Sequence, residues 1–204
     1  MLYINSVSSN GTYNVFGAKY PRNNWTTSDN YKIFTAKIPP FGAVKQTMID
    51  TIDQKYTDVA AGHVLLNDSS EILLGVRYST TIWYPIVIKF DKNQKFVWEK
   101  DFPINTASIS TEQISLCKDG GFLIVGNIAK TGYLATQPYI LKIDENGIKV
   151  WDKTILSIFG NGSFQYGINL NDGSYAFVGY SNQFGNNLNG NQILFVKTDA
   201  NGNF

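Results

Sequence analysis

The sequence predicts an all-β protein built from repeated four-stranded antiparallel sheets, and three observations predict it. The first is a hairpin of two apolar strands around a polar turn, ILKIDENGIKVW over Ile140–Trp151, which recurs as IVIKFDKNQKFVW over Ile86–Trp98. The second is a shorter hairpin ahead of each copy, such as KDGGFLIVG over Lys118–Gly126. The third is that no long segment keeps apolar residues at helical spacing, while Val, Ile, Thr, Tyr and Phe dominate the apolar runs.

A glycine at the end of the shorter hairpin marks each repeat, at Gly17, Gly75, Gly126 and Gly179. An Asn or Asp begins the turn before each of them, because its side chain caps the turn backbone. The copies recur at intervals of roughly 50 residues, and a unit of that length with four short strands is typical of a β-propeller blade. We therefore expect a β-propeller of four-stranded antiparallel blades.

The predicted blades cover residues of about 1–51, 52–102, 103–155 and 156–204 of a single domain. The first contains the strands Leu2–Ser8, Thr12–Lys19, Lys32–Ile38 and Ala43–Thr51. The second contains Val59–Leu66, Glu71–Tyr78, Pro85–Asp91 and Lys95–Phe102. The third contains Ser110–Cys117, Phe122–Ile128, Tyr139–Asp144 and Ile148–Ile155. The fourth contains Phe164–Leu170, Tyr175–Tyr180 and Gln192–Asp199.

The fourth blade therefore lacks its final strand. A ring needs every blade completed, since an unpaired edge leaves backbone groups open to aggregation. We expect this chain to be part of a larger propeller, or another chain to supply a strand at the blade 4 edge. Strands such as Ile72–Leu74 and Phe122–Val125 are apolar on both faces, as in a sheet that lies between two others.

The composition excludes several classes of function. There are 17 basic and 16 acidic residues, so the net charge is close to zero and does not favour binding of nucleic acid. Cys117 is the single cysteine, which excludes an intramolecular disulfide and a thiolate metal cluster, and we expect a buried, inert thiol. No run approaches the roughly 20 apolar residues of a membrane helix, and no signal peptide is visible. A polar but weakly charged surface favours an extracellular or cell-surface protein.

The repeated residues have structural interpretations. Trp98 and Trp151 occupy equivalent positions and are expected to be packing anchors between blades. Asp91, Asp144 and Asp199 are expected to form turns rather than to bind calcium, which needs more carboxylates. A lysine stands two residues before each aspartate, at Lys89, Lys142 and Lys197, and is expected to pair with it. Gly75, Gly126 and Gly179, which end the shorter hairpins, are also expected to be structural residues.

Catalytic motifs are missing from the sequence. His63 is the only histidine, and no neighbouring nucleophile or second ligand accompanies it, so we expect a structural residue. No metal-ligand spacing and no phosphate-binding loop occurs, and no cofactor is expected. Carboxylates that act on a glycosidic bond need no motif, and Asp101 and Glu112 flank one loop, where solvated surface is the simpler interpretation.

Aromatic residues in the variable loops are the candidate binding residues. The loops after the second strand of each blade and those that join blades emerge on one face. They carry Arg22, Trp25, Trp83, Tyr84, Tyr133, Phe159 and Phe184. Exposed aromatic rings beside amide and guanidinium groups suit stacking on sugars or anchoring of a protein partner. The alternative is that each ring packs over its own loop.

The string ILKIDENGIKVW, followed after a loop by NDGSYAFVGY over Asn171–Tyr180, resembles repeats of secreted β-propeller proteins of Bacteroidota. Those repeats are related in shape to pyrroloquinoline-quinone-dehydrogenase-like propellers. The resemblance implies secreted or cell-surface placement, often as a non-catalytic module, and matches no quinone- or metal-binding residue here. Pro39–Gly42 replaces the usual turn in the first blade, which departs from the pattern.

Three functions follow from these observations. The first is a non-enzymatic β-propeller module that binds a protein or a glycan, or serves as a scaffold at the cell surface. The second is a carbohydrate-active enzyme, for which two rim carboxylates about 5–10 Å apart would be diagnostic. The third is a structural subunit of a larger surface assembly, for which a large apolar interface would be diagnostic.

Overall fold

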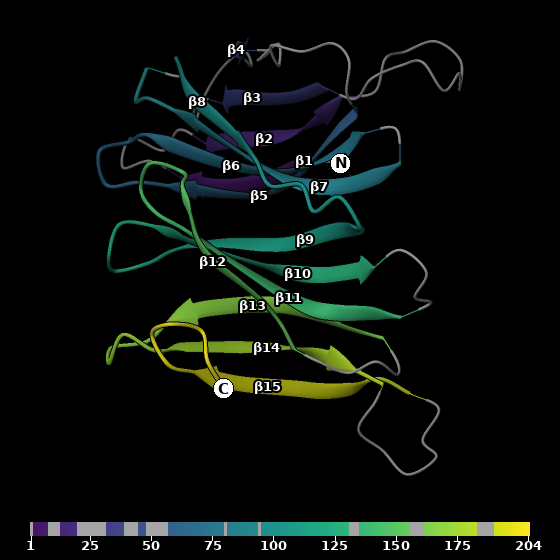
Figure 1. The fold of residues 1–204 in the computed structure, drawn as a ribbon. Coiled ribbons are helices and arrows are strands. Elements are labelled where there is room, and N and C mark those ends of the chain that lie inside the picture. The colour runs from purple at the N-terminus through teal and green to yellow at the C-terminus, as the bar shows by residue number, and fades with distance from the viewer. Residues whose placement is uncertain are drawn as a thin grey trace.

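The structure is a computed structural model that describes residues 2–7, 13–19, 32–38, 45–47, 57–79, 81–93, 95–130, 135–155, 161–182 and 190–204, with side chains from residue 61 onward. All regular structure in these ranges is β-strand, so the predicted all-β class is confirmed (Figure 1). The strands form four antiparallel sheets, each in chain order. The same residues include no helix long and apolar enough to span a bilayer.

The strand bounds agree with the predicted repeat. The first sheet contains β1 Leu2–Val7, β2 Tyr13–Lys19, β3 Lys32–Ile38 and β4 Lys45–Thr47. The second contains β5 Thr57–Leu65, β6 Glu71–Ser79, β7 Ile82–Phe90 and β8 Phe96–Asp101. The third contains β9 Ala107–Leu116, β10 Phe122–Lys130, β11 Thr136–Ile143 and β12 Lys149–Thr154. The fourth contains only β13 Gly162–Asn169, β14 Tyr175–Ser181 and β15 Gln192–Thr198.

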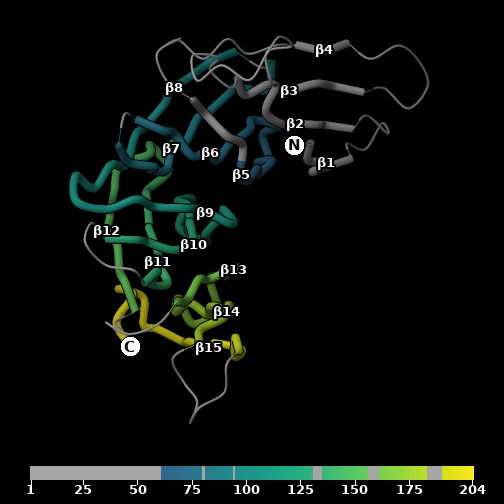
Figure 2. The backbone as a smooth tube through the Cα atoms, turned by 90° about the vertical axis from the view of Figure 1, so that its right-hand side faces the viewer, coloured from purple at the N-terminus to yellow at the C-terminus, as the bar shows by residue number. Residues whose placement is uncertain are grey.

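Successive sheets pack face to face. In Figure 1 the second, third and fourth sheets follow one another from top to bottom in chain order, and Figure 2 shows these three along a curve. The first strands of neighbouring sheets lie side by side, since β5 contacts β1 and β9, and β9 contacts β13. Within the described residues no sheet closes on itself. We call the face of each sheet toward the preceding sheet its near face, and the opposite face its outer face.

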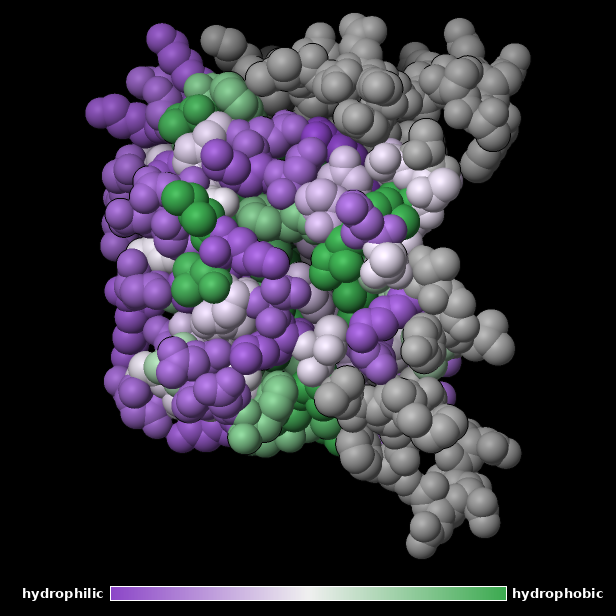
Figure 3. Space-filling view, in the orientation of Figure 1, coloured by the Kyte–Doolittle hydropathy of each residue, from purple (hydrophilic) through white to green (hydrophobic). Residues whose placement is uncertain are grey.

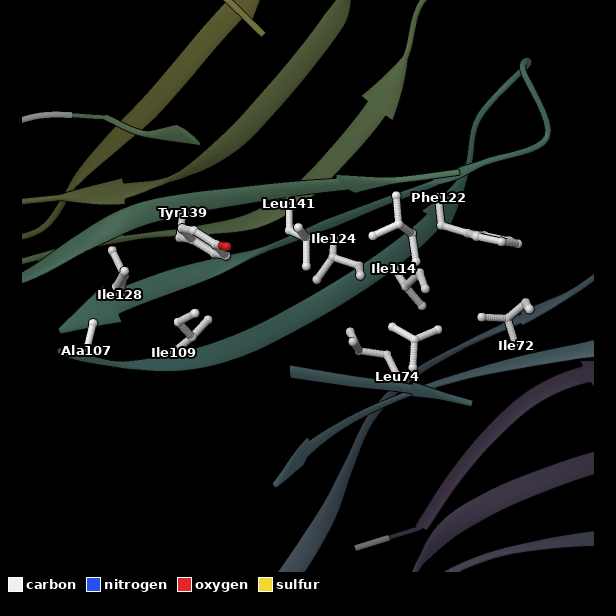
Figure 4. Close-up of a cluster of buried hydrophobic side chains, with 12 residues drawn as sticks. Ile72, Leu74, Ala107, Ile109, Ile114, Phe122, Ile124, Ile128, Tyr139 and Leu141 are labelled. Atoms are coloured by element: carbon white, nitrogen blue, oxygen red, sulfur yellow. The ribbon is translucent and has the colours of Figure 1, made fainter. Parts of the chain in front are cut away.

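Two apolar cores lie between the last three sheets. The core between the second and third sheets contains Ile72 and Leu74 from β6, and Ile114, Phe122 and Ile124 from β9 and β10 (Figure 4). The core between the third and fourth sheets contains Cys117, Leu123, Val125, Ile140, Phe164, Tyr175, Phe177 and Leu194. Strand β10 thus buries both faces, as its continuous apolar sequence predicts. Burial raises the pKa of the Cys117 thiol to about 11, so it stays protonated at neutral pH.

A β-bulge interrupts the first strand of every sheet. In the last three sheets the bulge lies at the same position, because the pairing shifts by one residue beside the repeated glycine and leaves Ala61, Glu112 or Gln165 without a partner. In the first sheet the shift falls at Asn5, two residues further along β1. A Cβ atom on Gly126 would meet the Ser110 carbonyl oxygen, so the glycine makes room for the bulge of the third sheet.

Candidate functional site

The turn aspartates are engaged with their own backbone. One carboxylate oxygen of Asp91, Asp144 and Asp199 accepts the N–H groups two and four residues further on, at 2.7–2.9 Å. Those hydrogen bonds hold the pKa of Asp199 below its ordinary value. The described residues contain no cluster of ligating side chains that could hold a metal ion. The carboxylates of these turns therefore serve the hairpins themselves.

The lysines of the third strands pair with a different aspartate from the one predicted. The Lys142 Nζ lies 3.0 Å from an Asp119 oxygen, and Lys197 Nζ lies 3.0 Å from Asp172. The predicted pairing of Lys142 with Asp144 is wrong, because the bonded oxygen of Asp144 is directed at turn amides. Gly121 allows the observed contact, since a Cβ atom there would meet Lys142 Nζ. Each of these two lysines thus ties the third strand to the first turn of its own sheet.

The two repeated tryptophans lie against glycines of the following sheet. A Cβ atom on Gly147 would lie 3.0 Å from the Trp98 ring, and one on Gly202 would lie 2.9 Å from the Trp151 ring. Both glycines have positive φ, 77° and 74°, as their turns require. The Trp151 ring also packs edge-on against Tyr175, with centroids 5.6 Å apart. This geometry suits a packing anchor between sheets.

The predicted aromatic rim is only partly within the described residues. Arg22, Trp25, Tyr133, Phe159 and Phe184 lie outside them. Trp83 is 39% exposed and stacks at 4.6 Å on Tyr78, with the rings tilted by 37°. Tyr84 is buried with Ile86 and Ile88 and presents little surface. Trp83 and Tyr78 therefore form the one described aromatic pair on this rim.

Several exposed apolar residues of the described chain lie together on the outer face of the last sheet. It carries Tyr166 and Ile168 from β13, Val178 from β14, and Ile193 and Phe195 from β15, all exposed. Registry aligns three of them in one row, with Tyr166 opposite Val178 and Val178 opposite Phe195. Hydrophobic residues reach the surface at the lower end of Figure 3, over this sheet, whereas the rim that carries the tight turns is mostly hydrophilic. We call these five residues the outer apolar face.

The equivalent positions of the two preceding sheets are buried. Val178 and Phe195 are paired across the strands in the same way as Val125 and Ile140 in the third sheet. Those two residues are 0% exposed, whereas Phe195 is 71% exposed. In the second sheet the equivalent pair, Leu74 and Val87, is also 0% exposed. The repeat therefore places the same chemistry at a covered position in two sheets and at an open one in the last.

The bulge residues form a polar feature. The sequence predicts Glu112 only as a carboxylate beside a loop and does not predict its place in a bulge. Glu112 from β9 and Gln165 from β13 occupy equivalent bulges of adjacent sheets and are joined by a side-chain hydrogen bond. Burial raises the pKa of Glu112, and the Gln165 hydrogen bond partly opposes that rise. The signal in the sequence was the glycine beside each of these bulges. A bulge adds one residue to an alternating strand, so its position is hard to read from polarity alone.

A groove of about 360 Å³ lies between the end of β8 and the hairpin of β11 and β12. Of the charged residues in its lining, Asp101 lies 3.0 Å from the buried Arg77 and Lys149 lies 3.0 Å from Asp152. Burial and the nearby Asp152 carboxylate raise the pKa of Tyr139, which therefore stays protonated. The groove has a mixed lining of apolar and charged side chains, with no activated nucleophile among them.

Comparison with known proteins yields a structural likeness and no family assignment. No family model matches the chain, and no curated protein matches it. Among the solved structures that match is a glycosyl hydrolase from Bacteroides ovatus, at 10% identity and a TM-score of 0.47. The match covers 96% of this chain, and this chain spans 65% of the length of that one.

Proposed function

We propose that this chain is a non-enzymatic β-propeller module, of the repeat type found in secreted proteins of Bacteroidota, that serves as an assembly subunit outside the cell or at its surface. Its four sheets are the blades, each a meander packed on the next, with the first strands adjacent. The outer apolar face is its assembly surface, and the occupant is the first sheet of a second copy. The observation that carries the proposal is that the two preceding sheets bury completely the residues equivalent to Val178 and Phe195.

The first sheet fits this role by register. In the first sheet Val15 lies opposite Ala36. This pair is equivalent to Leu73 and Ile88, which lie opposite each other in the second sheet. Leu73 and Ile88 belong to the buried near face of the second sheet. A first sheet placed on the last sheet of another copy would therefore continue the existing packing. Such contacts are head to tail, and they form a ring if the rotation closes.

Sedimentation of the purified chain tests this assembly. We expect wild-type protein to associate with increasing concentration, and the double substitution Ile168→Thr and Phe195→Thr to weaken association by about tenfold or more, since it removes two apolar side chains of the surface, one from each outer strand of the sheet. Ile148→Thr, at an exposed apolar residue away from that face, is the matched control and should associate as wild type. A wild-type monomer up to about 100 µM, or equal association of all three proteins, would refute the assembly.

The bulge positions support the non-enzymatic part of the proposal. A retaining or inverting glycosidase needs two carboxylates facing one bond. The equivalent bulges of the last three sheets carry Ala61, Glu112 and Gln165. Only Glu112 among these three residues has a carboxylate. A second carboxylate would have to come from elsewhere in the chain. The glutamate–glutamine hydrogen bond between sheets suits a structural link at this edge.

Glycan binding at Trp83 is the second candidate function, favoured by the exposed pair of Trp83 and Tyr78. The face of a sugar ring stacks on such a platform. We expect Trp83→Ala to abolish glycan-array signals that the wild-type protein gives, and Trp83→Phe to retain part of them. Val97→Ala, at an exposed residue of β8, is the control. Array signals that persist in Trp83→Ala would assign the glycan site elsewhere.

A further inference from the structure

The outer edge of β15 presents backbone groups that no described strand pairs. β15 pairs with β14 on its inner side without a register shift. At the end of the strand the Asp199 N–H turns outward and donates to the Asn203 carbonyl at 2.9 Å. Backbone groups alternate in direction along a strand, so those of Lys197, Phe195 and Ile193 point to the same outer edge.

The turn beside this edge, Asp199–Asn203, is held by its own hydrogen bonds and by contacts with the third sheet. Asn203 donates its backbone N–H and its side-chain amide to the two carboxylate oxygens of Asp199, at 2.8 and 3.0 Å. Lys153 of the third sheet donates to the Asn203 side chain at 3.2 Å, and Gly202 lies under the Trp151 ring. The edge is therefore held in a defined place and needs no reorganisation to accept a strand, which favours binding.

The two preceding sheets show which strand fits. Their fourth strands share one pattern, Val-Trp-acid-Lys, at Val97–Lys100 in β8 and Val150–Lys153 in β12. In both, the valine lies at a bulge and the tryptophan stands opposite a lysine of the third strand, Lys89 or Lys142. β15 carries Lys197 at the equivalent position.

From this geometry we infer that the outer edge of β15 binds an extended segment of the pattern Val-Trp-(Asp or Glu)-Lys, antiparallel, with its tryptophan opposite Lys197 and its lysine opposite Phe195. The two strands of this pattern in the sequence given, β8 and β12, are already paired in their own sheets, so the segment is a further copy of the pattern. Backbone hydrogen bonds supply the affinity, as in other cases where a peptide adds to a sheet edge. The inference rests on the proposed propeller, whose last blade this strand completes.

A blocked peptide with the sequence of Val150–Ile155, VWDKTI, is the probe, added to the full chain. It omits Ile148 and Lys149, because Asn203 and Phe204 already stand at the equivalent positions of the last sheet. At saturating peptide we expect hydrogen exchange of the Phe195 and Lys197 amides to slow by about tenfold or more, because they gain acceptors. The amides of Leu194 and Val196, which face β14, should exchange at unchanged rates. No slowing at Phe195 and Lys197, or equal slowing at all four, would overturn the inference.

N-methylated peptides provide a control that leaves the protein unaltered. In β12 the Ile155 N–H donates to Pro138, so the N–H of Lys153 faces the same partner strand and that of Asp152 faces away. Methylation at the lysine nitrogen should reduce affinity by about tenfold or more, and methylation at the aspartate nitrogen should not. Equal affinities of the two peptides would refute strand addition.

Proline substitutions test the same edge from the protein side. Pro85 and Pro138 occupy the position equivalent to Ile193 in the two preceding sheets, so Ile193→Pro should keep peptide binding. Phe195→Pro removes an outward N–H and should abolish it. The peptide carries no sheet to cover the outer apolar face, so it reports on the edge alone. Peptide binding by a chain that does not self-associate would refute the proposed assembly and uphold this inference. Self-association of a chain that does not bind the peptide would uphold the assembly and refute this inference.

Discussion

Replacing Trp151 with alanine is expected to lower the free energy of unfolding by about 3–5 kcal/mol. The indole lies between sheets, against the backbone of Gly202 and edge-on to Tyr175, and packs on the apolar core between the third and fourth sheets. Glycine offers no side chain that could move into the space left behind, so the cavity would persist. Urea unfolding of the wild-type and variant proteins, followed by far-UV circular dichroism, measures the loss.

Trp98→Ala should show a loss of similar size, because its ring lies on Gly147 in the same way and packs on the core between the second and third sheets. Trp83→Ala is the matched control: it makes the same chemical change at a rim position where the ring is 39% exposed, and should cost clearly less. Losses below about 1 kcal/mol in both Trp98→Ala and Trp151→Ala would exclude these residues as anchors between sheets.

The repeat made much of the fold predictable. A turn that begins with Asp and continues to Gly has few backbone solutions, so the hairpin positions could be read directly. The unbroken apolar run Phe122–Val125 identified a strand buried on both faces, and the structure places alternate residues of it in two different cores. The three strands of the last sheet were also predicted, with the turn at Asp199 after the third of them.

Features that depend on the relation between strands were not predictable in the same way. The partner of Lys142 was misassigned because strand alternation favours Asp144, whereas the space above Gly121 directs the lysine to Asp119. The outer apolar face has the same alternating apolar pattern in the sequence as a buried face. Phe195 follows the same alternation as Ile140, and only the arrangement of sheets shows that nothing among the described residues lies over it.

Gly126→Ala is expected to destabilise the fold by about 3 kcal/mol or more, at the upper end of what overpacking costs. The new methyl group would meet the Ser110 carbonyl and would lie 2.8 Å from Thr111 Cα, and both contacts are with backbone. Backbone in the middle of a paired strand cannot move aside as a flexible side chain does. Gly179→Ala should behave alike, because the equivalent bulge brings the Ser163 carbonyl and Phe164 Cα to the same places.

Gly190→Ala is the matched control, since a Cβ atom there has no neighbour within 4 Å among the described residues, and Gly190 is not among the described glycines with positive φ. It should change the free energy of unfolding by less than about 0.5 kcal/mol. Thermal or urea unfolding of the three variants measures the free energy of unfolding, and so separates destabilisation at the bulge from the general effect of adding a methyl group to a glycine. If Gly126→Ala unfolds like Gly190→Ala, the repeated glycine is not required by the bulge. The recurrence of glycine beside the bulges of the last three sheets would then need another cause.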